Sequence, residues 1–203
     1  MLGADSWRVR SVAVEGSGEG APDAEAELVA RAKADRGAFA PLYQRYLGPV
    51  YGYCRGCLGS REAAEDATSL VFAKALDGLA GCCEGLFRSW LFAIAHNVVV
   101  DARRRARPVV PIAAADDVPD PGRGPEAAAV AAEHDRALRE LLGRLPDEQR
   151  HVVELRLAGL TGPEIARALG RSHGAVRVAQ FRAYNRLRML LVAEDEEVRD
   201  ERR

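Results

Sequence analysis

The stretch that decides the fold is LGRLPDEQRHVVELRLAGLTGPEIARALGRSHGAVRVAQFRAYNRLR, residues 142–188. Its apolar spacing and punctuation predict a helix from about Asp147 to Ala158. That helix ends at Gly159, because glycine tolerates the left-handed conformation in which helices often finish. Thr161 then caps a second helix, and Glu164 three residues later completes a capping box. The segment therefore predicts at least two helices joined by one tight turn.

A second tight turn follows at once. The capped helix ends at Gly170, and Ser172 caps a further helix that runs to about Leu191. Two helices joined in this way are typical of a helix-turn-helix, whose second helix lies in the major groove of DNA. Five arginines with no acidic residue between them mark this last segment: Arg171, Arg177, Arg182, Arg186 and Arg188. The sequence therefore predicts DNA binding.

The chemistry of this helix suggests a role for each polar side chain. Ser172 satisfies N–H groups at the helix start, and Arg177 and Gln180 lie near one face, where arginine can pair with guanine and glutamine with adenine. Arg182 and Arg186 are expected to hold phosphates, which position a protein without specifying sequence. The candidate DNA-binding residues here are Ser172, His173, Arg177, Gln180, Arg182 and Arg186. The alternative is a solvated arginine-rich surface.

The overall charge conceals this pattern. The 203 residues carry a formal net charge of -1, but basic residues gather in 103–107 and 171–188, while acidic residues gather in 194–201. Local field, not total charge, governs binding to nucleic acid. We find no apolar run long enough for a membrane span and no signal peptide, so we expect a cytoplasmic protein with no membrane insertion and mostly reduced cysteines.

The chain divides into five segments by composition. We expect a disordered N-terminal tail over 1–24, a helical domain over 25–107, a flexible Pro/Ala/Gly-rich linker over 108–133, a helix-turn-helix domain over 134–192 and a charged C-terminal tail over 193–203. Strand-like alternation is absent from the sequence, which predicts an all-α fold of two small helical domains joined by a linker.

The first domain has its own helical pattern. Apolar residues recur at three- and four-residue spacing over 39–54, and Gly48-Pro49 predicts a kink or a break within that element. Ser60 can cap a helix that runs to about Leu76. A glycine-rich loop over 77–86 separates it from a last helix over about 89–105.

The motifs of both domains resemble those of a single protein family. The second domain carries Leu145-Pro146, Gly159-Leu160-Thr161, Glu164-Ile165-Ala166, Leu169-Gly170 and Gly174-Ala175-Val176-Arg177. The first carries AFAPLYQRYLGPVYGY (38–53), EAAEDATSLVFAKAL (62–76) and FRSWLFAIAHNVVVDARRR (87–105). Together, on either side of a linker, these motifs resemble a sigma-70-type RNA polymerase sigma factor of the extracytoplasmic-function group.

The resemblance implies a function and sites in both domains. It implies that the chain binds core RNA polymerase, that the last helix of the first domain and its preceding loop engage the promoter -10 element, and that the helix-turn-helix reads the -35 element. The implied DNA contacts of the first domain are Trp90, Asn97, Asp101, Arg103 and Arg104, and the implied polymerase contacts are Asp66, Ser69 and Phe72. The family usually carries a Gln-Glu pair where this chain has Ser69-Leu70. Trp90 can alternatively be a core aromatic, because it shares a face with Leu91 and Ile94.

Other classes of function receive less support from the sequence. Cys54 and Cys57 have the spacing of a metal or redox pair, but Cys54 falls on the apolar stripe, where cysteine acts as a small hydrophobe. We therefore expect no metal and no cofactor, and the absence of a nucleophile triad or phosphate-binding loop argues against an enzyme. A stand-alone helix-turn-helix regulator stays open as an alternative, as does a thiol- or metal-based sensor. The resemblance also implies an anti-sigma factor as a partner.

Overall fold

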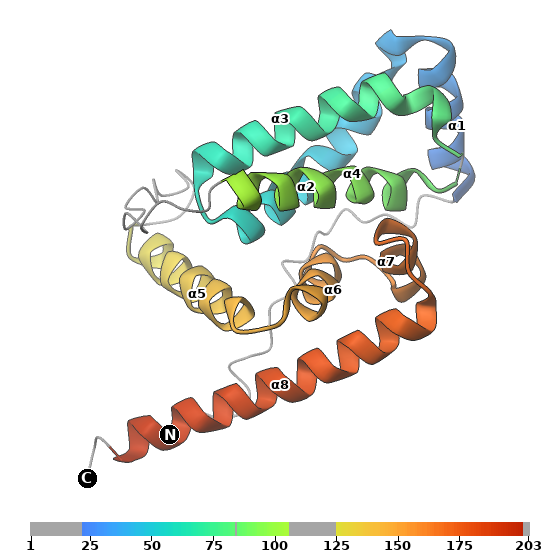
Figure 1. The fold of residues 1–203 in the computed structure, drawn as a ribbon. Helices are drawn as coiled ribbons and strands as arrows, with labels where there is room; N and C mark the ends of the chain where they lie inside the picture. The colour runs from blue at the N-terminus through green and yellow to red at the C-terminus, as the bar shows by residue number, and fades with distance from the viewer. Residues whose placement is uncertain (1–21, 84, 106–124, 201–203) are drawn as a thin grey trace.

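The chain folds into helices. The computed structural model describes residues 22–83, 85–105 and 125–200, and no strand occurs within these ranges. The α-helices are α1 (Pro22–Ala34), α2 (Ala40–Leu58), α3 (Arg61–Gly78), α4 (Phe87–Arg105), α5 (Pro125–Gly143), α6 (Asp147–Leu157), α7 (Gly162–Ala168) and α8 (His173–Asp200). Two 3-10 turns, Arg36–Phe39 and Leu79–Gly81, connect neighbouring helices. The predicted all-α fold is confirmed (Figure 1).

The local signals that predicted the helix-turn-helix are present. The Thr161 N–H donates to the Glu164 carboxylate at 2.7 Å, and the Ala175 N–H donates to Ser172 Oγ at 3.2 Å. Gly159 and Gly170 adopt φ angles of 84° and 62°, in the region that favours glycine. The turns and caps are therefore where the sequence predicts them.

Pro49 does not break its helix, contrary to one of the two outcomes that the sequence allowed. It lies inside α2, which runs unbroken from Ala40 to Leu58. Proline removes one backbone hydrogen bond from a helix. The buried face of α2 offsets this cost, because Leu42, Tyr46, Val50, Tyr53 and Cys54 all enter the core on both sides of the proline.

Two helices extend into segments that composition assigned to linker and tail. α5 begins at Pro125, so helix occupies the end of the 108–133 segment, and α8 continues to Asp200. The first extension, 125–133, is rich in Ala and the second, 193–200, in Glu, and both residue types have high helix propensity. The predicted N-terminal tail up to residue 21, the linker over 106–124 and residues 201–203 lie outside the described residues.

α4 lies at the centre of the packing. It packs against α2 and α3 on one side and against α7 on the other, and Figure 1 shows α6 and α7 between the α2–α4 layer and α8. Phe87, Leu91 and Phe92 of α4 are fully buried, and they belong to the same apolar cluster as Leu155 and Ile165. The two helical units, α1–α4 and α5–α8, therefore share one apolar cluster, and a second, smaller cluster lies within the second unit. No helix in the described ranges is long and apolar enough to cross a membrane.

Candidate nucleic-acid interface

α8 carries the first candidate surface. Val176, Ala179 and Ala183 are buried against the rest of the second unit, which turns the intervening residues of the helix outward. His173 and Arg177 are exposed at its N-terminal end. The first turns of a recognition helix are the part that reaches base edges in a major groove.

One face of α8 combines the candidate base-reading residues with a tyrosine. His173, Arg177, Gln180 and Tyr184 follow one another at spacings of four, three and four, so they share a face. Gln180 Nε2 donates to the Tyr184 hydroxyl at 3.0 Å. Sequence reasoning missed Tyr184, although its helical spacing from Gln180 was a usable signal.

Two further arginines of α8, Arg182 and Arg186, lie away from this face. Arg182 and Arg186 are exposed, and their spacing places them on the opposite side of the buried stripe from Arg177. Ser172 caps the helix through Oγ, as its hydrogen bond to Ala175 shows. The candidate base-reading residues and the candidate phosphate-binding arginines thus lie on different sides of α8, and their contacts with DNA stay predictions.

The turn before α8 holds His173 close to α7. A Cβ built on Gly162 would lie 2.8 Å from His173 Nε2, which is closer than real Cβ atoms approach other atoms. The missing side chain of Gly162 therefore makes room for the imidazole. This contact fixes the position of His173 at the start of the recognition helix.

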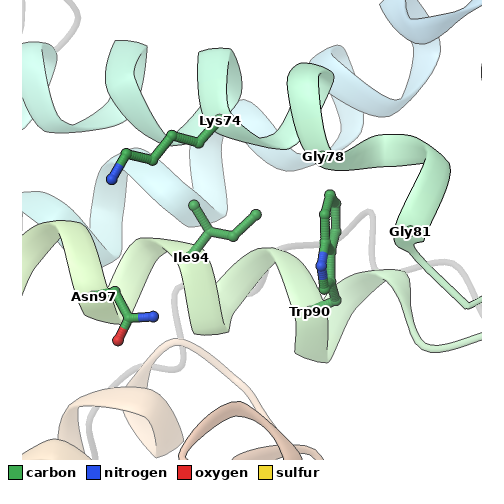
Figure 2. A pocket seen from close by; sticks show the side chains of 6 residues that line it. All are labelled: Lys74, Gly78, Gly81, Trp90, Ile94 and Asn97. Atoms are coloured by element: carbon green, nitrogen blue, oxygen red, sulfur yellow. The ribbon is translucent and has the colours of Figure 1, made fainter.

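A second candidate surface lies between α3 and α4. Lys74 and Gly78 of α3, Gly81, and Trp90, Ile94 and Asn97 of α4 line a hollow of about 320 Å³. Figure 2 shows Ile94 between Trp90 and Asn97 along α4, with the Lys74 side chain on α3 extending away from Trp90 toward the Asn97 end of the hollow. The hollow combines an aromatic wall, an amide and a cation. Sequence reasoning missed Lys74, which lies on a different helix from the other polar residues.

Trp90 is half-buried and belongs both to the core and to the hollow. Its ring lies 5.8 Å from the Phe87 ring, while one side of the indole lines the open space. A Cβ on Gly78 would lie 3.2 Å from the indole, so the glycine lets the ring pack closely on the end of α3. The packing on Phe87 agrees with the core-aromatic interpretation of Trp90, and its role as a DNA contact stays a prediction.

The other predicted residues of α4 separate into two groups. Asn97, Asp101 and Arg104 are exposed. The Arg103 side chain turns toward α6 instead and binds the Glu154 carboxylate at 2.6 Å. A role for Arg103 in DNA binding stays a prediction, and in this structure its guanidinium is engaged with protein.

The three candidate polymerase contacts of α3 differ in exposure. Asp66 and Ser69 are exposed. Phe72 is buried, with its ring 4.7 Å from Tyr43 and 6.5 Å from Phe39. Tyr43 itself is 41% exposed, so it is the aromatic side chain that solvent reaches on this part of the molecule. These roles stay predictions.

The cysteines form no site among the described residues. None of the four forms a disulfide bond, and no group of three or more His, Cys, Asp or Glu side chains in the described ranges could hold a metal ion. Burial raises the pKa of Cys54 to about 11 and that of Cys57 further still. A raised pKa disfavours the thiolate, which is the reactive form.

Comparison with known proteins identifies both units. Residues 42–109 match the family described as Sigma-70 region 2, and residues 135–187 match Sigma-70, region 4. SigD of Mycobacterium tuberculosis, an ECF RNA polymerase sigma factor, is 35% identical over 82% of this chain and 83% of its own length. BldN of Streptomyces coelicolor, also an ECF sigma factor, is 35% identical over 81% of this chain, but the alignment spans only 65% of BldN.

A solved structure supports the arrangement as a whole. CnrH in complex with the cytosolic domain of CnrY superposes with a TM-score of 0.69 at 26% identity, over 84% of this chain and 99% of CnrH. The two matched regions follow each other in the same order as the two units described above. The chain belongs to the sigma-70 family of RNA polymerase sigma factors, in the extracytoplasmic-function group.

Proposed function

We propose that this chain is a promoter-specificity subunit that binds core RNA polymerase and directs initiation from promoters with a -10 and a -35 element. The domain assignment behind this proposal is 25–107 for polymerase and the -10 element and 134–192 for the -35 element. The polymerase carries out the chemistry, and this chain acts with it in the cytoplasm. The observation that carries the proposal is the presence of two separate candidate DNA surfaces, one on each unit.

The hollow between α3 and α4 suits a single unstacked base. An exposed strand needs a stacking surface, an edge to hydrogen-bond and cations along the backbone. Trp90, Asn97 and Lys74 supply these three features around one space. We assign the -10 contact to this hollow, with the exposed Asp101 and Arg104 as neighbouring contacts.

The -35 contact falls to α8. Arg177 and Gln180 suit guanine and adenine edges in the major groove, and Tyr184 extends the same face. Arg182 and Arg186 suit the flanking phosphates. A stand-alone regulator would need only this helix, and the base-sized hollow on the other unit favours the sigma factor.

Asp66 and Ser69 are the exposed candidates for polymerase contact on α3. CnrH is bound to a second protein, the cytosolic domain of CnrY, in its structure. We propose that this chain also binds a partner protein and that this partner is an anti-sigma factor. No residue of this chain identifies that partner.

Reconstitution tests the proposed function. Purified chain and core RNA polymerase, mixed on a randomised promoter library, should yield transcripts that start at specific sites. Core polymerase alone is the control for non-specific initiation. Initiation no greater than that of core alone, from a chain whose helical circular dichroism is intact, would contradict the proposal.

A further inference from the structure

The two units meet along an interface that contains part of their shared apolar cluster and that charged side chains also cross. Near the start of α4, Arg88 Nη2 donates to the Gly159 carbonyl at 2.9 Å, and Arg88 Nη1 lies 3.7 Å from Glu164 Oε1. Near its end, Arg103 reaches Glu154 of α6. α4 therefore contacts the second unit through arginines near both of its ends.

The contact at Arg103 is the most buried of these. Its guanidinium donates to both carboxylate oxygens of Glu154, at 2.6 and 3.3 Å, and to the Cys57 carbonyl at 2.8 Å. The Glu154 side chain is 5% exposed. A buried carboxylate needs such a partner, because removing one member of the pair leaves an uncompensated charge inside the protein. The pair therefore joins α2, α4 and α6.

Two histidines meet beside this pair. The rings of His96 on α4 and His151 on α6 lie 4.5 Å apart at 76°, and His96 Nδ1 lies 3.4 Å from the Tyr53 hydroxyl of α2. The titratable and charged groups around them are Tyr53 and Cys57 on α2, Arg103 on α4, and Asp147, Arg150 and Glu154 on α6. A proton on His151 would thus lie beside a second imidazole and two arginines, whereas a proton on His96 would lie near Arg103 and the Glu154 carboxylate.

We propose that His96, Arg103, His151 and Glu154 form a proton-sensitive latch that holds the two units in a closed state, which must open before both promoter elements are bound. The closed state leaves Asn97 and Arg177 exposed, so it does not cover the DNA surfaces themselves. The closed state instead fixes the distance between the candidate DNA surface on α4 and the one on α8.

The size of the molecule makes opening necessary, and this step rests on the proposed function. Elements named -10 and -35 lie about 25 base pairs apart, which is roughly 85 Å of B-form DNA at about 3.4 Å per pair. A compact chain of 203 residues is only about 45 Å across. One closed molecule therefore cannot reach both elements.

Protonation favours the open state. Burial lowers the pKa of His96, and burial together with the charges of His96, Arg103 and Arg150 lowers the pKa of His151 to about 4. In the open state the His151 ring regains its ordinary pKa of about 6.5, so the open state binds more protons. The closed state is therefore favoured above about pH 6.5 and loses this advantage as the pH falls toward 4. For His151 alone, the open-to-closed ratio rises about tenfold between pH 7.5 and 5.5.

Energy transfer between two dyes measures this equilibrium in the full chain. One dye goes on the exposed Cys83 of the first unit and the other on an introduced Asn185→Cys in α8, also exposed. We expect high transfer at pH 7.5 and a shift of molecules to low transfer at pH 5.5. The double variant His96→Gln, His151→Gln should lose this pH response.

Charge variants test the latch at constant pH. Glu154→Gln should shift molecules to low transfer at pH 7.5, whereas Glu148→Gln on the same helix should not, because Glu148 pairs with Arg171 within the second unit. Exchanging the partners, Arg103→Glu with Glu154→Arg, should restore part of the high-transfer population. If Glu154→Gln fails to fold, the pH dependence of energy transfer in the chain with all four latch residues unchanged still tests the proposal.

Three results would overturn the proposal. They are unchanged transfer at pH 5.5, a transfer loss accompanied by loss of helical circular dichroism, and a pH response that persists in the double histidine variant. All measurements use the chain without polymerase or DNA. A negative result in these measurements would therefore not contradict the proposed function. A negative result in the reconstitution with core polymerase would not contradict the proton-sensitive closed state.

Discussion

Arg177 and Arg186 lie on different sides of the buried stripe of α8, so their substitutions should differ in kind. Arg177→Ala should cost about 1–3 kcal/mol on promoters with the preferred -35 sequence and relax that preference at one position. Arg186→Ala should weaken binding to all sequences alike and lower the salt slope by about one. Binding of each variant, with core polymerase, to a set of single-base -35 variants measures both effects. A uniform loss for Arg177→Ala would assign it to phosphate instead.

The cysteines also give a prediction at the residue scale. Cys54 and Cys82 are buried, and burial raises the pKa values of Cys54 and Cys57, so little thiolate forms on either at pH 8. We expect one fast thiol equivalent per native chain in a colorimetric thiol titration, from the exposed Cys83. Four fast equivalents would contradict the packing of α2. Reversible oxidation with a change in activity would instead revive the sensor alternative.

The ends of individual helices can be predicted from sequence where the contact that stabilises them joins residues close together in the chain. The caps at Ser60, Thr161 and Ser172 and the turn at Gly159 were predictable, because each depends on residues within three or four positions. The continuity of α2 through Pro49 was not, because it depends on burial against other helices. The presence of Lys74 and Trp90 in the lining of one hollow likewise comes from packing of α3 on α4.

Two glycines should respond in opposite ways to the same substitution. Gly56→Ala lies on the exposed face of α2, with open space around the new methyl group, and should stabilise the chain by about 0.5–1 kcal/mol. Gly159→Ala must place alanine at a φ of 84° and should destabilise it by about 1–2 kcal/mol. Urea unfolding followed by circular dichroism measures both. Equal effects of the two substitutions would mean that the turn at Gly159 does not have this conformation.

The whole molecule is where sequence reasoning was weakest. The resemblance implied a DNA contact for Arg103, which stays a prediction, and only the fold shows the guanidinium bound to Glu154, fifty-one positions later in the chain. The meeting of His96 with His151 has the same origin, because no periodicity relates residues on two separate units. The order of the two units, by contrast, was readable from their motifs and is confirmed by both family matches.

The central claim is that each unit reads its own promoter element. Promoters selected from a randomised library by this chain with core polymerase should contain two enriched blocks at a preferred spacing. Arg177→Ala should relax the upstream block and leave the downstream block intact, and Asn97→Ala should do the reverse. A single enriched block with the unmodified chain, or relaxation of the same block by both variants, would contradict the account.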